Sequence, residues 1–209
     1  MSIISCCVVF SSLTITLFAQ SGGDVVSVEE LRNPLTGRSL RMILTAQEHL
    51  KSGQRERGME ELRAAMGDPV AMPYAISLLG VEHVRAGQLD TALDELELAV
   101  QVLPRPENRS NLAYVLYLKK QTGRGLEEVR KAIQMDGGVP KTRLVLGLLL
   151  LQQGSHEDEA VQQLQAAARE NPSAHLVLAQ HYDRAGKAPE AEKERSAYTV
   201  MSMGLLATK

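Results

Sequence analysis

Apolar and polar residues alternate along most of the chain at the spacing of helices that bury one face. Aliphatic and small residues recur every three or four positions, and charged residues occupy the positions between them. The pattern predicts helices over 40–52, 55–67, 73–86, 89–102, 108–121, 125–136, 141–153, 157–170, 174–185 and 188–203. Because these segments are short and closely spaced, neighbours are expected to pack as antiparallel pairs.

Glycine and proline mark the ends of the predicted helices. Four first helices end at a glycine, the residue best suited to a left-handed conformation: Gly53, Gly87, Gly154 and Gly186. Second helices end near a proline, which cannot continue a helix: Pro69, Pro104, Pro140 and Pro172. In the third pair the corresponding glycine is Gly123, about three residues late. We therefore expect the turn inside that pair to be displaced.

Two columns of residues repeat with a period near 34. Small residues of the first helices stand at Ala46, Gly80, Ala113, Gly147 and Ala179, at intervals of 34, 33, 34 and 32. Large aliphatic residues of the second helices stand at Leu62, Leu96, Val129 and Leu164, at intervals of 34, 33 and 35. Alanines follow these by three positions, at Ala65, Ala99, Ala132 and Ala167. Small residues let paired helices approach closely, and each pair covers the apolar face of the next.

The individual units resemble tetratricopeptide repeats. The clearest unit runs from Tyr74 through Gly80, Gly87 and Leu96 to Pro104. Two further units resemble it: Leu146-Gly147 with Ala160, Leu164, Ala167 and Pro172, and Leu178-Ala179 with Tyr182, Gly186 and Ala191. The resemblance covers about 39–203, and 39–71 and 107–140 match less closely.

This resemblance implies an all-α fold, a right-handed α-solenoid of about five antiparallel helix pairs. It also implies a protein that binds other proteins or peptides and carries no catalytic centre. A helical bundle whose spacing is accidental stays open as the alternative.

The first 38 residues precede the repeats. Residues 1–21 carry an uncharged apolar run from Ile3 to Ala19 followed by small residues, which is typical of a secretory signal peptide. The alternative is a membrane anchor through residues 3–19. Residues 22–38 are expected to form a flexible linker, in which 25–31 could form a short helix, and residues 39–209 the repeat domain. We thus expect an exported protein, periplasmic or secreted, without membrane attachment after cleavage.

Composition narrows the classes of function. Both cysteines, Cys6 and Cys7, and both phenylalanines, Phe10 and Phe18, lie in the expected leader, so the mature chain could form no disulfide. The remaining core residues are mainly Leu, Val and Ala, which suit helices. The net charge is -2, and basic and acidic residues are interspersed rather than grouped. Because a nucleic-acid-binding protein usually carries a basic stripe, nucleic acid is not an expected partner.

No constellation of catalytic residues is found in the sequence. His156-Glu157 begins a zinc-protease-like string, but Ala160 stands where the second histidine is needed. Gly123-Arg124-Gly125 lacks the third glycine of a dinucleotide loop, because residue 128 is Glu128. We therefore expect no enzyme, no metal and no cofactor. Asn108-Arg109-Ser110 fits a glycosylation acceptor, which we interpret as a chance occurrence.

The candidate binding site follows from the resemblance, which places the first helices along a concave groove. The expected groove positions are Gln47 and Leu50, Val81 and Val84, Tyr114 and Tyr117, Leu148 and Leu151, and Gln180 and Asp183. Since the middle three pairs are apolar or aromatic, they predict a groove for an apolar peptide or amphipathic helix. The partner-binding residues are then Val81, Val84, Arg85, Tyr114, Tyr117, Leu148 and Leu151. Alternatively, tight curvature or residues 25–31 bury these side chains.

Other family features shape the expected partner. Members of the family also clamp C-terminal carboxylates with lysine and asparagine, but Val81, Tyr114 and Leu148 hold positions that would need an asparagine. Lys51, Arg85 and Arg184 could still orient an acidic partner. The sequence favours an exported protein- or peptide-binding scaffold.

The alternative is a structural repeat protein that self-associates in an envelope assembly as a homo-oligomer. Its basis is the apolar end of the last helix, at Tyr198, Met201, Met203, Leu205 and Leu206.

Overall fold

The computed structural model describes residues 35–207 of the chain. The expected leader, 1–21, and nearly all of the expected linker, 22–38, lie outside the described residues. The described chain divides into two compact units, which we call the N-terminal unit (residues 35–132) and the C-terminal unit (residues 133–207).

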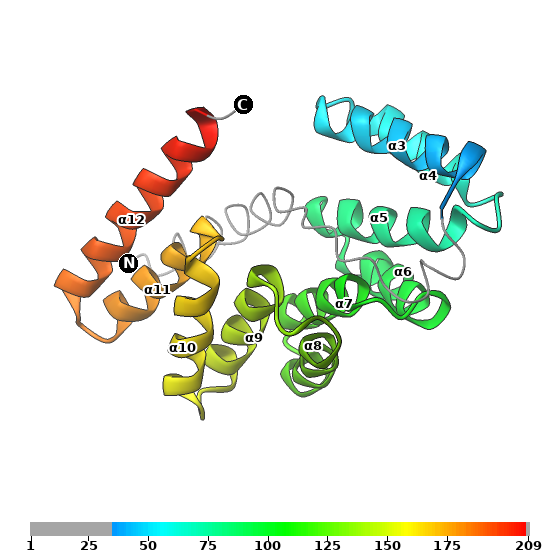
Figure 1. The fold of residues 1–209 in the computed structure, drawn as a ribbon. Coiled ribbons are helices and arrows are strands. Elements are labelled where there is room, and N and C mark those ends of the chain that lie inside the picture. Colours follow the sequence, from blue (N-terminus) through cyan, green and yellow to red (C-terminus); the bar gives the residue numbers. More distant parts are fainter. Residues whose placement is uncertain (1–34, 208–209) are drawn as a thin grey trace, which may run out of the picture. The chain divides into compact units, whose positions relative to one another are not determined.

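Every regular element in the described residues is a helix (Figure 1). In the N-terminal unit these are α3 (Gly37–Lys51), α4 (Arg55–Ala65), α5 (Met72–Arg85), α6 (Leu89–Val102), α7 (Pro106–Leu118) and most of α8 (Thr122–Asp136). The C-terminal unit contains the end of α8 and then α9 (Pro140–Gln153), α10 (Glu157–Ala168), α11 (Pro172–Arg184) and α12 (Ala188–Ala207). The predicted all-α fold is confirmed.

Several predicted helices begin one or two residues late. The structure starts α7, α9 and α11 with a proline, at Pro106, Pro140 and Pro172. Proline is favourable at the first helical position because its missing N–H would have no partner there. Pro140 and Pro172 thus mark the end of one helix and also begin the next, a second role that their use as helix breakers does not predict.

Helices pack as consecutive pairs, and successive pairs pack on one another. The pairs α3 with α4 and α5 with α6 lie in the N-terminal unit, and α9 with α10 and α11 with α12 lie in the C-terminal unit. Successive pairs meet where α4 packs against α5, α6 against α7, and α10 against α11. This arrangement confirms the solenoid of helix pairs that the repeat period predicted.

The small residues of the first column lie where the helices of a pair approach most closely. A β-carbon added at Gly80 would lie 2.7 Å from Cγ of Leu96, and one added at Gly147 would lie 2.5 Å from Cγ of Leu164. Both leucines are completely buried. The two columns of the sequence therefore form the two sides of one contact.

The turn inside the third pair is not displaced, so the expectation based on Gly123 is wrong. The left-handed residue of that turn is Lys120, with φ of 62°, and Gly123 lies inside α8. Left-handed residues follow the small residue of each repeat by seven positions, in the pairs 46 and 53, 80 and 87, 113 and 120, 147 and 154, and 179 and 186. Stacking of the pairs therefore fixes where the turn falls, and the third repeat fills that position with lysine.

Replacing Gly80 by alanine should test the close approach. We expect Gly80→Ala to lower the free energy of unfolding by about 1–3 kcal/mol, because the new methyl group overlaps the buried Leu96 side chain. Urea denaturation followed by far-UV circular dichroism measures the change.

Gly123→Ala is the matched control. No atom lies within 4 Å of a β-carbon added at Gly123, which is exposed on α8. Alanine is the better helix former, so this variant should gain roughly 0.5 kcal/mol. Equal destabilisation by both variants would contradict the packing role assigned to Gly80.

Candidate binding surface

The first helices α5 and α7 carry most of the candidate residues. They belong to successive pairs of the N-terminal unit, and they contact each other directly (Figure 1). The side chains of Val81, Arg85 and Tyr117 are partly exposed. Val84 and Tyr114 are buried, with exposed fractions of 5% and 2%. We refer to Val81, Arg85 and Tyr117 as the α5–α7 surface.

The remaining two candidates lie in the C-terminal unit. Leu148 on α9 is buried, with an exposed fraction of 6%, and Leu151 is partly exposed. Lys51 and Arg184, two of the charges expected to orient an acidic partner, are exposed at the ends of α3 and α11.

Arg85 is held by a buried carboxylate that the sequence reading missed. Glu82 on α5 is 2% exposed and accepts hydrogen bonds from Arg85 and, at 3.0 Å, from Nε of Arg55 on α4. Nη2 of Arg55 also donates to the backbone oxygen of Glu82 at 2.6 Å. Two guanidinium groups thus neutralise one buried carboxylate and leave net positive charge at the end of α5.

Tyr117 is an aromatic side chain that contacts a second ring and a lysine. Its ring stacks on Tyr114, with centroids 6.0 Å apart and planes inclined by 21°. Nζ of Lys120 lies 5.6 Å from the centroid of the Tyr117 ring. The stack supports the ring from within the unit, while part of the ring remains accessible. A supported, amphipathic ring of this kind loses little conformational entropy on binding.

Lys120 occupies a backbone conformation that costs energy. A left-handed residue with a β-carbon is less stable by roughly 1–2 kcal/mol than one in the right-handed region, and glycine escapes this cost. The contact with the Tyr117 ring returns about 0.5–1 kcal/mol at an exposed position. The cost of the left-handed conformation equals or exceeds the energy that this contact returns. Fold stability therefore gives no reason for a lysine at this turn.

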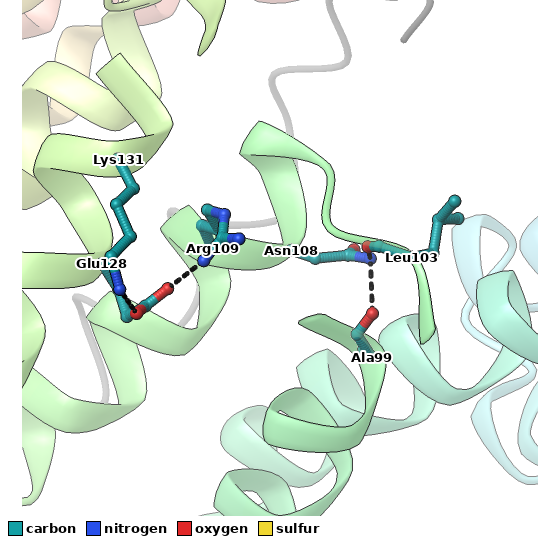
Figure 2. Close-up of polar contacts among 6 residues, drawn as sticks. All are labelled: Ala99, Leu103, Asn108, Arg109, Glu128 and Lys131. Atoms are coloured by element: carbon teal, nitrogen blue, oxygen red, sulfur yellow. Dashed lines mark hydrogen bonds and ion pairs between the residues drawn. The ribbon is translucent and has the colours of Figure 1, made fainter. Parts of the chain in front are cut away.

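Asn108 and Arg109 anchor α7 on opposite sides, as Figure 2 shows. Nδ2 of Asn108 donates to the backbone oxygens of Leu103, at 2.7 Å, and Ala99, at 3.3 Å. Its Oδ1 accepts from the Ser77 hydroxyl at 2.6 Å. Asn108 and Ser110 are 3% and 1% exposed. The glycosylation acceptor in the sequence is therefore buried in the folded chain, and its asparagine connects α7 to α5 and α6.

Arg109 holds α7 against α8 through Glu128. Nη1 of Arg109 lies 2.6 Å from the Glu128 carboxylate, which also accepts from Nζ of Lys131 at 2.7 Å (Figure 2). Burial raises the pKa of Glu128, but the hydrogen bonds and charges of Lys131 and Arg109 outweigh it and leave the pKa below the usual 4.5. The carboxylate is thus stabilised in its charged form.

Two histidines pair with a carboxylate inside their own helix pair. Nδ1 of His83 lies 2.5 Å from the Glu95 carboxylate, and Nδ1 of His175 lies 2.5 Å from that of Glu194. The first contact joins α5 to α6, and the second joins α11 to α12. In the part of the chain that the structure describes, no three His, Cys, Asp or Glu side chains gather where they could hold a metal ion. Nor is any described helix long and apolar enough to cross a bilayer.

Solved structures with the same architecture identify the fold. TTC0263, a thermophilic TPR protein from Thermus thermophilus, superposes with a TM-score of 0.67 over 77% of this chain and 89% of that chain, at 18% identity. The fold is that of a tetratricopeptide repeat protein.

MamA from Desulfovibrio magneticus RS-1 gives a TM-score of 0.60 over 81% of this chain and 98% of its own, at 14% identity. A crystal structure of MamA gives 0.57 over 78% and 96%, also at 14% identity. At these identities the likeness concerns the tetratricopeptide fold alone. No protein-family model matches the chain, and no curated protein matches it.

Glu128→Gln should reveal the stabilising charge of the Arg109–Glu128–Lys131 group. A carboxylate whose pKa is depressed in the folded state stabilises the fold above its unfolded pKa, and this contribution is lost as the pH falls. We expect the variant to lose about 1 kcal/mol at pH 7 and clearly less near pH 3.5, because that pH lies below the usual pKa of 4.5 and most of the charge contribution has been lost. Urea denaturation at the two pH values provides the measurement.

Glu127→Gln controls for the loss of charge alone, since Glu127 is the exposed neighbour of Glu128 on α8. It should change little at either pH. A Glu128→Gln effect of the same size at both pH values would show that the side chain acts through packing instead of charge.

Proposed function

We propose that this chain is a protein- or peptide-binding scaffold that uses the α5–α7 surface of its repeat array. The observation that carries the proposal is the partly exposed Tyr117, stacked on the buried Tyr114, on a helix that contacts the one bearing Val81 and Arg85. A supported aromatic ring on one helix, with an aliphatic side chain and an arginine on the helix that it contacts, has the composition of a binding hot spot. The inferred role is thus binding and not catalysis.

Exposure divides the predicted site residues into two groups in this proposal. A partner touches Val81, Arg85 and Tyr117 of the N-terminal unit, because these side chains have accessible surface. Leu151 of the C-terminal unit also has accessible surface and stays a separate candidate. Val84, Tyr114 and Leu148 do not touch the partner in this proposal, because they are almost completely buried. An apolar or amphipathic peptide fits this pattern, with an apolar side chain against the Tyr117 ring.

Self-association is the second candidate function. Val200 and Met203 on α12 are 72% and 65% exposed, which is high for large apolar side chains. A second copy of the chain could cover them. Val200→Glu would place a charge in such an interface.

We further propose that the chain is exported. The support is the uncharged apolar run from Ile3 to Ala19 and the small residues that follow it. The intact mass of protein recovered from its own host should correspond to a chain that begins after Ala19 or Ser21. A full-length mass in the membrane fraction would favour the anchor instead.

A displayed library of random peptides tests the binding function. We expect the full chain to select peptides with apolar or aromatic residues, and Tyr117→Ala to weaken their binding by about tenfold or more, since hot-spot aromatic residues contribute above 1 kcal/mol. Fluorescence anisotropy with a labelled selected peptide measures the affinity.

Tyr182→Ala is the matched control. Tyr182 on α11 is also partly exposed and also lies beside a lysine, with Nζ of Lys187 5.9 Å from its ring centroid. Peptides that bind both variants as they bind the parent chain would rule out the α5–α7 surface. Failure to select any peptide, together with a dimer mass by light scattering that Val200→Glu abolishes, would favour self-association.

A further inference from the structure

Lys120 stands at a position where the other turns of the array have glycine. The left-handed residues of the corresponding turns are Gly53, Gly87, Gly154 and Gly186, with φ between 71° and 78°. The Lys120 turn has the same hydrogen bonds as the turn at Gly87: in each, the left-handed residue donates to the carbonyl three positions back, at 3.1 and 3.0 Å. The following residue donates to the carbonyl five positions back, at 2.9 Å in both turns. The geometry of this turn therefore favours glycine, but the chain has lysine at this position.

The ammonium group of Lys120 differs from its neighbours in having no carboxylate partner. Lys119 pairs with Asp90, Arg124 with Glu97 at 2.5 Å, and Arg85 with Glu82. Among the described residues, no carboxylate lies within ion-pair distance of Lys120, whose Nζ faces the Tyr117 ring. A residue kept in a strained conformation that its contacts within the fold offset only in part is evidence for a role in function.

We propose that Lys120 binds the carboxylate of an aspartate or glutamate side chain in the peptide that docks on Tyr117. This proposal rests on the function proposed above and specifies the chemistry of the partner. The lysine offers three N–H donors beside a partly exposed aromatic ring. Such a pair recognises an acidic residue next to an apolar one. Further positive charge comes from Arg85 at the end of α5, from Arg55 at the start of α4 and from the exposed Lys51 at the end of α3. The surface is thus complementary to an acidic, amphipathic peptide.

Lys120→Gly separates binding from stability, because the two should change in opposite directions. Removing the β-carbon relieves the turn, and the melting temperature of the full chain should rise by about 2–4 °C. Affinity for a library-selected acidic peptide should fall about tenfold. A variant that damaged the fold would lower both quantities, so the opposite signs identify a residue that serves the partner.

Lys120→Gln and Lys119→Gln complete the experiment. The first removes the charge and keeps the strained turn, so we expect a similar loss of affinity with little change in melting temperature. The second removes the neighbouring charge, which already pairs with Asp90, and should leave affinity unchanged. When the acidic residue of the peptide is replaced by its amide, affinity should fall by the same factor, and Lys120→Gln should then cause no further loss.

Each outcome decides one proposal. Peptides that depend on Tyr117 but bind Lys120→Gly as tightly as the parent chain would overturn the role of Lys120 and leave the binding function intact. Equal losses of affinity with Lys119→Gln and Lys120→Gln would also overturn it, because the total positive charge of the turn would then account for peptide binding. If no peptide binds the parent chain, the proposed function and the role of Lys120 both fail.

Discussion

Close approach of the two helices within each pair is the contact on which the rest of the fold depends. Gly80 and Gly147 leave room for Leu96 and Leu164, which are completely buried and whose Cγ atoms would lie within 3 Å of an added β-carbon. Because a buried leucine contributes about 1.5–3 kcal/mol, a few such contacts at every pair outweigh the weaker preferences of individual turns. The spacing of the small residues therefore sets the position of every later element in the repeat.

The third turn shows how this constraint overrides local preference. Glycine favours the left-handed conformation by roughly 1–2 kcal/mol, which is less than the packing of a helix pair contributes. The turn therefore falls seven residues after Ala113, at Lys120, although Gly123 is only three residues away. The same conformational cost is the basis of the binding role that we propose for Lys120, because fold stability does not account for a lysine at this position.

Polar contacts add orientation to this apolar framework. Asn108 fixes the start of α7 against α5 and α6, and Arg109 fixes it against Glu128 of α8 (Figure 2). Glu82 in turn holds Arg55 and Arg85 at the end of α5. These buried and partly buried groups define how Tyr117 and Val81 are presented, since a helix held on both sides has little freedom to rotate. The surface that we propose for binding is thus rigid before a partner arrives.

The sequence alone determined the helices, their pairing and the repeat length, because the period of small and large residues directly encodes the contacts between neighbouring helices. The resemblance of this period to tetratricopeptide repeats also made Tyr117, Val81 and Arg85 candidates, since it places their positions along the expected groove. Only the tertiary structure decided which candidates are accessible, that Tyr114 and Val84 are buried, and that Arg85 is bound to Glu82. Exposure and ion pairing depend on side chains from other helices, and a pattern within one helix carries no information about them.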